Sequence, residues 1–367
     1  MKNNFVQNEF YFQWHITERC NLRCAHCYQN NYSTPELSLS DLRKIADKII
    51  KTLTKWNKKG RISITGGEPL IKKELIPLLE YLNKSDHVAH LDVLSNGTLL
   101  NESITEKLRN IPKLRRVQVS LDGASPATHD FIRGEGAFEK AIAGIRMLKE
   151  HGIKVNVMFT LQRNNARDIS ALFDLMIAEG INGLTIERII PCGSGSGLKE
   201  SLLSSDETRK VFQEVSDRAD LEYKKGTPLV VLKYRTLWAN IDPARSGMYA
   251  NTPPEMDLGA VCSVGIDSLC ILPDATVLPC RRLNIPIGNL RNDSIFKIWY
   301  SSDVLWKIRN KENLKGKCHD CELIPRCSGC RAMAYAVTGD FLEEDPQCWK
   351  TGNLRYGELL KDMCSTN

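Results

Sequence analysis

Apolar residues follow two alternating patterns along the chain up to residue 191. Short apolar runs rich in β-branched and aromatic residues predict strands, and the stretches between them have the three-to-four-residue spacing of amphipathic helices. Ser38 with Asp41 resembles a capping box in front of the clearest helical stretch. The predicted strands are 10–17, 61–65, 90–97, 114–123, 154–161 and 183–191, and the predicted helices are 40–56, 71–84, 102–110, 137–152 and 168–180.

Six such units in succession require parallel strands joined by right-handed crossovers. The sheet they form can curve into a partial barrel or stay open, and in either case ligands collect beyond the carboxyl ends of the strands. Five unusual loops, with the sequences CNLRCAHCY, GGEP, SNG, SLDG and PCGSGSG, follow these strands. We therefore expect the functional site where the five loops meet.

The strand–helix alternation weakens after residue 191. Residues 203–225 have a helical pattern, 240–258 are rich in turn-forming residues, and the chain from 259 onward is rich in cysteine. We therefore expect three parts, which are an α/β domain at 1–200, a helical and linker bridge at 201–258, and a cysteine-rich domain at 259–367.

The composition is that of a globular protein, because 42% of the 367 residues are hydrophobic and 26% are charged. The apolar runs are too short to span a bilayer, and the N-terminus lacks the pattern of a secretory signal. We expect a cytoplasmic protein with no membrane or nucleic-acid partner. The net charge of +6 is mild: it suits an acidic substrate or partner, but a mixed solvated surface is the more common cause of such a charge.

The thirteen cysteines indicate metal binding rather than disulfides, because their number is odd and no export signal is found. Cys20, Cys24 and Cys27 share the loop after the first predicted strand. Thiolates favour zinc, copper(I) or iron–sulfur clusters. Three of them can hold three corners of a cubic [4Fe–4S] cluster and leave the fourth iron open to another molecule. Zinc with a fourth ligand from elsewhere is the alternative.

The stretch CNLRCAHCY, with Tyr28 after its third cysteine, resembles the CxxxCxxC signature of the radical S-adenosylmethionine (SAM) enzymes. This resemblance implies a partial (β/α)6 TIM-type barrel and a [4Fe–4S] cluster whose open iron binds SAM. Reductive cleavage of SAM then yields a 5′-deoxyadenosyl radical, which abstracts a hydrogen atom from the substrate. The implied SAM-binding residues are Gly66, Gly67, Glu68 and Pro69 of GGEP, with Ser95, Asn96, Ser120, Asp122 and Arg133 on later loops.

A second group of eight cysteines lies between residues 262 and 348 and resembles the SPASM extension of radical SAM enzymes. Ala275 replaces the glycine usual in that pattern, which raises a question about the local turn. Eight thiols suffice for two further [4Fe–4S] clusters, and zinc is the alternative. By analogy, auxiliary cluster I takes Cys262, Cys270, Cys280 and Cys330, and auxiliary cluster II takes Cys318, Cys321, Cys327 and Cys348. Without Cys270, cluster I would keep an open iron for substrate.

The resemblance leaves the substrate open. The leading hypothesis is a maturase of peptides or proteins, served by an electron donor such as flavodoxin or ferredoxin. Only about nine residues precede the first strand, so we expect a peptide to be recognised by the barrel or by a separate leader-binding protein. One alternative is maturation of a tetrapyrrole or of a tungsten or molybdenum cofactor. The other is a non-catalytic iron–sulfur electron carrier.

Arg281 and Cys192 are candidates for a catalytic role. Arg281 and its neighbour Arg282 follow Cys280, where the formylglycine-forming branch of the family has an aspartate, so we disfavour that activity. These arginines can bind a carboxylate substrate or form a surface ion pair. Cys192, after the sixth strand, can donate a hydrogen atom or can be a small packing residue.

Overall fold

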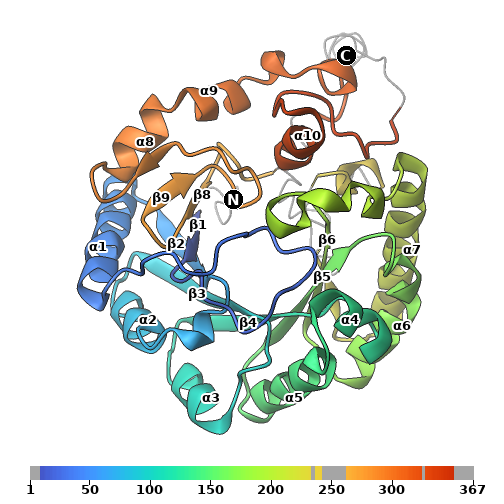
Figure 1. Cartoon of the computed structure of the whole chain (residues 1–367), viewed down its shortest axis with the longest axis horizontal. Coiled ribbons are helices and arrows are strands. Elements are labelled where there is room, and N and C mark those ends of the chain that lie inside the picture. The colour runs from blue at the N-terminus through green and yellow to red at the C-terminus, as the bar shows by residue number, and fades with distance from the viewer. Residues whose placement is uncertain (1–8, 233–235, 242–261, 325–326, 351–367) are drawn as a thin grey trace, which may run out of the picture.

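A curved sheet of ten strands forms the centre of the molecule (Figure 1). The computed structural model describes residues 9–232, 236–241, 262–324 and 327–350. The strand order is β10-β9-β8-β1-β2-β3-β4-β5-β6-β7. The strands are β1 (Glu9–His15), β2 (Lys59–Thr65), β3 (Val88–Ser95), β4 (Leu114–Ser120), β5 (Val155–Leu161), β6 (Gly183–Arg188), β7 (Val230–Val231), β8 (Ser268–Ile271), β9 (Thr276–Leu278) and β10 (Gly288–Asn289).

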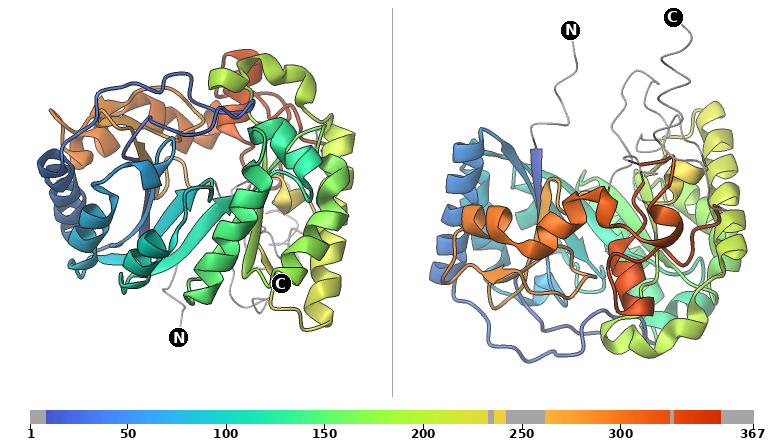
Figure 2. Two further views of the ribbon diagram at one scale, coloured as in Figure 1. Left: turned by 60° about the horizontal axis from the view of Figure 1, so that its bottom comes forward. Right: turned by 90° about the horizontal axis from the view of Figure 1, so that it is seen from above.

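Helices cover the outer face of this sheet, and Figure 2 shows them around its convex side. Ser38 caps the first helix as predicted, because its hydroxyl accepts a hydrogen bond from the Asp41 N–H. The α-helices are α1 (Leu39–Trp56), α2 (Leu75–Asn83), α3 (Glu102–Arg109), α4 (Pro126–Arg133), α5 (Ala137–Glu150), α6 (Ile169–Ala178), α7 (Ser205–Lys224), α8 (Ile295–Ser301), α9 (Asp303–Arg309) and α10 (Arg331–Thr338). The 3₁₀ helices are Pro69–Ile71, Ala166–Asp168, Gly193–Ser201, Trp238–Asn240, Lys311–Asn313 and Gly316–Cys318.

The predicted α/β barrel with six parallel strands is confirmed, and the structure adds a parallel strand at each side of it. Strand β7 pairs with β6, and β8 pairs with β1 through contacts such as Tyr11 opposite Ser268. The short strands β9 and β10 continue the sheet in antiparallel fashion. The sheet thus crosses both of the domain boundaries expected at 200 and 258, and those boundaries stay predictions.

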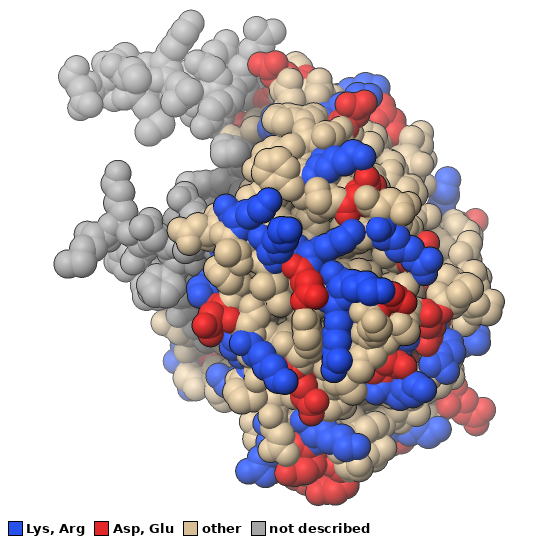
Figure 3. Space-filling view, turned by 90° about the vertical axis from the view of Figure 1, so that its left-hand side faces the viewer, with Lys and Arg blue, Asp and Glu red and all other residues tan. Residues whose placement is uncertain are grey.

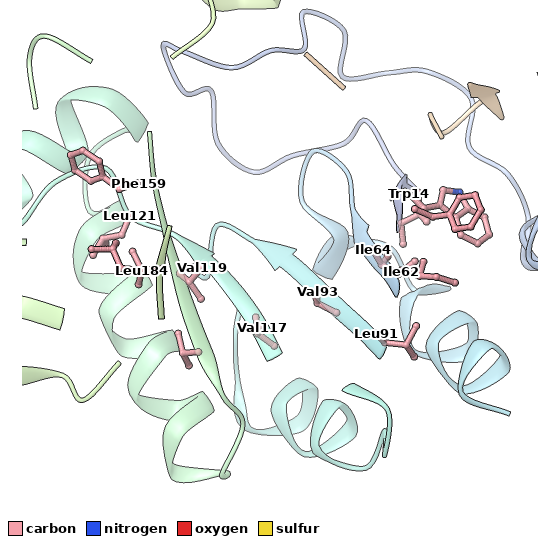
Figure 4. Packing of buried hydrophobic residues seen from close by; sticks show 14 of the residues in the cluster. Trp14, Ile62, Ile64, Leu91, Val93, Val117, Val119, Leu121, Phe159 and Leu184 are labelled. Atoms are coloured by element: carbon pink, nitrogen blue, oxygen red, sulfur yellow. The ribbon is translucent and has the colours of Figure 1, made fainter. Parts of the chain in front are cut away.

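The two faces of the barrel strands differ in chemistry. Phe10, Phe12 and Trp14 alternate along β1 and are buried beneath the helices, together with the residues labelled in Figure 4. Tyr11 and Gln13 point the other way and line an internal cavity. Barrels of this type usually fill their interior with branched apolar side chains. Here the inner face is largely polar and leaves space for ligands.

The C-terminal region is tied to the barrel by a buried ion pair. Arg188, at the end of β6, donates from its two terminal nitrogens to the two Asp345 carboxylate oxygens at 2.9 and 2.7 Å.

Ala275 has a φ of 73° in the turn between β8 and β9, a conformation that favours the glycine of the family pattern. The turn therefore forms with alanine, at a cost in backbone strain of about 1 kcal/mol.

The outer surface carries both signs of charge. On the side of the molecule that bears α1, lysines and arginines are interspersed with aspartates and glutamates (Figure 3). This agrees with the mixed solvated surface expected from the mild net charge. Within the described residues, none of the helices has the length and apolarity needed to span a membrane.

Candidate functional site

A cavity of about 1120 Å³ extends along the barrel interior, from Glu9 and Lys58 at the amino ends of the strands to the loops at their carboxyl ends. Most of the residues singled out from the sequence line it, so the expected convergence of the loops is observed. The predicted residues on its wall are Cys20, Cys24, Cys27, Gly66, Gly67, Ser95, Asn96, Ser120, Arg133, Cys192, Cys262, Cys270, Cys280, Arg281 and Cys330. The others, which do not line it, are Glu68, Pro69, Asp122, Cys318, Cys321, Cys327 and Cys348.

The glycines of GGEP pack directly against the three-cysteine loop. The N–H of Gly67 donates to the Thr17 carbonyl at 2.8 Å, and the N–H of Glu68 donates to the Arg19 carbonyl at 2.8 Å. A Cβ on Gly67 would lie 2.4 Å from the Arg19 carbonyl oxygen, so a side chain cannot fit there. These glycines therefore let two loop backbones approach each other, in addition to any contact with SAM.

The loop after β6 supports the cysteine loop from another side. Gly193 has a φ of 60°, and a Cβ on it would lie 2.2 Å from the Tyr28 carbonyl carbon. The Gly195 N–H donates to the Cys27 carbonyl at 3.1 Å. The sequence PCGSGSG is thus glycine-rich where it must lie against the backbone of the thiol-bearing loop.

Glu68 is held by hydrogen bonds to its own loop and to the loop after β3. It is fully buried, and its carboxylate accepts hydrogen bonds from the Ser95 hydroxyl and the Asn96 N–H, both at 2.8 Å, and from the Leu70 N–H at 3.1 Å. Burial raises the pKa of Glu68 to about 7, although these donors favour the carboxylate. Glu68 therefore joins the GGEP and SNG loops, and the contact with SAM that the family resemblance implies for it stays a prediction.

Asp122 organises two basic side chains beside the thiols. Its carboxylate accepts a hydrogen bond from Arg133 Nε at 2.6 Å and lies 3.0 Å from His26 Nε2. Burial opposes ionisation of Asp122, but Arg133 and His26 hold its pKa well below the ordinary range. Arg133 Nη1 in turn donates to Cys24 Sγ at 3.8 Å. Arg133 thus lines the cavity, an orientation that the sequence left open, whereas Asp122 is buried and does not line it.

The residues of this loop suit an iron–sulfur cluster in their donor type and placement. Cys20, Cys24 and Cys27 share one cavity wall, and burial raises the pKa of the Cys20 thiol to about 11. A bound metal is therefore needed to stabilise its thiolate. Among the described residues, no three Cys, His, Asp or Glu side chains are grouped closely enough for a single metal ion. The fit to a larger cluster rests on the soft donors and the shared wall.

The C-terminal cysteines divide in space along the division predicted for the two auxiliary clusters. The first set of four, Cys262, Cys270, Cys280 and Cys330, faces the cavity. Cys270 is buried in β8, within the sheet itself. The structure therefore places Cys270 on the same wall as the other three, and its role as a ligand stays a prediction.

The second set lies outside the cavity, and three of its four thiols are buried. Arg331 donates from Nη2 to Cys318 Sγ at 3.7 Å, and Asn240 donates from Nδ2 to Cys348 Sγ at 3.6 Å. Burial raises the pKa of Cys327 to about 12. N–H donors aimed at sulfur are typical of the surroundings of iron–sulfur clusters. Ligation by this set remains a prediction.

Sequence reasoning missed several residues that position these sites. The Arg188–Asp345 pair joins positions far apart in the chain, and nothing in the local pattern indicates it. Asp345 also accepts a hydrogen bond from the Cys330 N–H at 2.8 Å, so it positions one of the predicted ligands. Helix α4, which carries Arg133, lies in a segment for which the hydrophobic spacing predicts no helix, although Ser125–Pro126 is a typical helix start.

Two family models match the chain in the regions that carry the predicted resemblances. Residues 14–176 match the model of the Radical SAM superfamily, and residues 262–322 match SPASM, an iron–sulfur cluster-binding domain.

Similar proteins match over nearly the whole chain. The AdoMet-dependent heme synthase of Methanosarcina barkeri is 31% identical, over 91% of this chain and 95% of its own length (AdoMet is SAM). The Fe-coproporphyrin III synthase of the same organism is 30% identical, over 92% and 87%. The antilisterial bacteriocin subtilosin biosynthesis protein AlbA of Bacillus subtilis is 27% identical, over 88% and 68%.

A solved structure shares the fold at lower identity. SuiB of Streptococcus suis, determined bound to its precursor peptide SuiA, superposes with a TM-score of 0.72 at 17% identity and covers 94% of this chain and 76% of its own. At this identity the likeness extends to the architecture of barrel and C-terminal domain, and not to the substrate.

Proposed function

The chain belongs to the radical SAM superfamily and carries a SPASM domain, and from this premise we propose that it uses a SAM-derived radical to modify a tetrapyrrole. Membership of the family was predicted from the cysteine motifs and is confirmed. The order of the two substrate hypotheses is reversed, because the relatives support the cofactor alternative better than the peptide hypothesis.

The two domains imply a SAM-binding [4Fe–4S] cluster and auxiliary iron–sulfur clusters. Cys20, Cys24 and Cys27 are the thiols that would hold the first cluster, and the C-terminal cysteines would hold the others. When bound and reduced, the first cluster supplies the electron that splits SAM into methionine and the 5′-deoxyadenosyl radical. This chemistry disfavours the electron-carrier hypothesis, since a carrier needs no SAM site.

The observation that carries the tetrapyrrole proposal is the extent of the match to the heme synthase, which exceeds 90% of both chains. The cavity supports it in two ways. Its volume of about 1120 Å³ exceeds the ~300–1,000 Å³ of an ordinary small-molecule pocket, so there is room for more than one ligand. Its wall carries nine lysines and arginines against four aspartates and glutamates, which suits a substrate with carboxylate side chains.

The residues of the chain have separate tasks in this proposal. Arg133, fixed by Asp122, presents a cation beside Cys24, where it would pair with the SAM carboxylate. The backbones of Gly66 and Gly67 form the wall where the SAM amine would lie. In this proposal the barrel wall would shield from water the space in which the radical meets a substrate C–H bond. Hydrogen transfer then yields 5′-deoxyadenosine and a substrate radical.

The test is an anaerobic assay of reconstituted protein with SAM and a chemical reductant, in which 5′-deoxyadenosine and the mass of the tetrapyrrole are measured together. We expect iron coproporphyrin III or a related porphyrin to raise 5′-deoxyadenosine formation and to change in mass, with Cys24→Ala as the inactive control. SAM cleavage that no porphyrin stimulates would contradict the tetrapyrrole proposal while leaving the radical SAM chemistry intact.

Peptide modification is the second candidate, favoured by the match to AlbA over 88% of this chain. The two candidates make opposite predictions in the same assay. Stimulation of 5′-deoxyadenosine by a peptide and by no porphyrin would restore the peptide hypothesis.

A further inference from the structure

Arg281 is a buried cation on the cavity wall. Arg281 follows Cys280 in the sequence, shortly after β9. It lines the cavity and is only 7% exposed. The guanidinium carbon lies 4.5 Å from the centre of the Tyr28 ring, so the group is stacked on the aromatic residue that ends the cysteine motif. The Nε–H is buried and has no hydrogen-bond partner among the described residues.

Three other arginines that line the cavity have carboxylate partners. Arg133 lies 2.6 Å from Asp122, Arg188 lies 2.7 Å from Asp345, and Arg282 lies 3.0 Å from Glu187. No carboxylate of the described residues lies within 4 Å of Arg281. Glu18 is farther away and interacts with its charge only through space. A buried unpaired donor costs about 1–3 kcal/mol, and more when it is charged. A bound acceptor would remove this cost.

The position of Arg281 relative to Arg133 gives the cavity two cationic walls. In Figure 1, α4, which ends with Arg133, and β9, which precedes Arg281, lie on opposite sides of the barrel mouth. Both side chains line the same cavity, and Cys27 and Cys192 line it as well. One wall would serve the carboxylate of SAM, which leaves the other for a second anionic molecule.

We propose that Arg281 binds a carboxylate of the substrate across the cavity from Arg133. This inference rests on the proposed function, because porphyrins on the way to haem carry propionate side chains. The planar guanidinium donates in a fork that matches a carboxylate, and the Tyr28 ring beneath it fixes its plane. Arg281 is therefore a residue that determines specificity, and neutral analogues of the substrate lose its contribution.

The test is an equilibrium titration that needs no turnover. Reconstituted protein is titrated with coproporphyrin III and with its carboxamide derivative, and binding is followed by porphyrin fluorescence. We expect the wild type to prefer the acid, and Arg281→Gln to weaken acid binding by roughly 10–100-fold while leaving amide binding unchanged. Arg281→Lys should restore part of the affinity. Arg291→Gln, at an exposed position, is the matched control.

Each outcome assigns the role of Arg281. Equal affinity of Arg281→Gln and wild type for the acid would overturn the inference. Loss of iron or a changed auxiliary-cluster spectrum at unaltered porphyrin affinity would overturn it too, by showing that Arg281 neutralises a cluster. If Arg281→Gln does not fold, equal wild-type affinity for acid and amide would overturn it. If wild type binds neither porphyrin, the proposed function fails, and this inference fails with it.

Discussion

The two thiol-bearing regions of the molecule are built on different kinds of backbone. The loop with Cys20, Cys24 and Cys27 follows a regular strand and is held by loops from neighbouring strand ends. The C-terminal thiols lie mostly on irregular segments between short helices and strands. Glycine backbones from neighbouring loops pack closely against the first region, whereas a long-range ion pair holds the second region to the barrel. Side-chain donors reach sulfur in both regions.

Both regions contain a buried arginine–aspartate pair, but the pairs do different work. Asp122 and Arg133 are near each other in sequence, and the pair presents a cation to the thiol of Cys24. Arg188 and Asp345 lie 157 residues apart in the chain, and their pair fastens the C-terminal region to β6. Local structure thus orients the first site, while contact between distant segments creates the second.

The sharpest test of this comparison removes one thiol from each region. We expect Cys24→Ala to lower 5′-deoxyadenosine formation by more than about 100-fold, because loss of a direct ligand should cost more than the 10–100-fold of an outer-shell change. Cys318→Ala should retain SAM cleavage. Each variant should lose about four irons per chain, measured by iron analysis. Equal loss of SAM cleavage in both would mean that the regions do not act separately.

The Arg188–Asp345 contact can be broken by Arg188→Met, which leaves Asp345 buried without its cation. We expect a loss of about 3–5 kcal/mol in the free energy of unfolding, measured by denaturant titration. Arg146→Met, which removes the exposed pair with Glu179, is the control and should cost at most about 1 kcal/mol. A cost for Arg188→Met as small as that of the control would show that this pair does not fasten the two regions.

The glycine packing of the first region can be tested by Gly193→Ala. The added Cβ clashes with the Tyr28 backbone at a positive φ, so we expect about 3 kcal/mol of destabilisation. The first cluster should be lost selectively, seen as a loss of SAM cleavage with auxiliary iron retained. Gly197→Ala has open space around its Cβ and should behave as wild type. Loss of auxiliary iron in Gly193→Ala would contradict the independence of the two regions.

The raised pKa of Glu68 leads us to expect a smaller effect, a free energy of unfolding that depends on pH. Its folded pKa of about 7 lies above the value of 4.5 expected when unfolded, so the protonated group stabilises the fold at acid pH. That contribution is lost as the pH rises through about 7, and amounts to about 2 kcal/mol between pH 5 and 7. Glu68→Gln should make the free energy of unfolding depend less on pH over this range, as measured by denaturant titration at several pH values. Glu80→Gln, at an exposed position, should leave the pH dependence unchanged. An unchanged slope in Glu68→Gln would refute the assignment.

The parts that could be predicted from the sequence are those set by local patterns. The six strands and Ser38 follow from hydrophobic spacing and capping chemistry, and the cavity-facing cysteines follow from motif spacing. Strand β7 has only two residues, too few to show the alternation of apolar and polar residues that predicts a strand. Strand β8 lies in a cysteine-rich stretch where hydrophobic spacing predicts no strand. The orientation of Glu68 depends on hydrogen bonds to another loop, which no local pattern reports.

The pairing of β8 with β1 has a consequence for how the chain reaches its native state. Tyr11 on β1 pairs with Ser268 on β8, which is synthesised much later. One edge of β1 therefore has no partner strand until most of the chain has been made. At ~5–20 residues per second this interval lasts on the order of ten seconds or more during synthesis. Over that time an apolar strand presents unpaired N–H and C=O groups, which promotes aggregation. Chains that end before β8 should therefore accumulate as aggregates rather than as a smaller barrel.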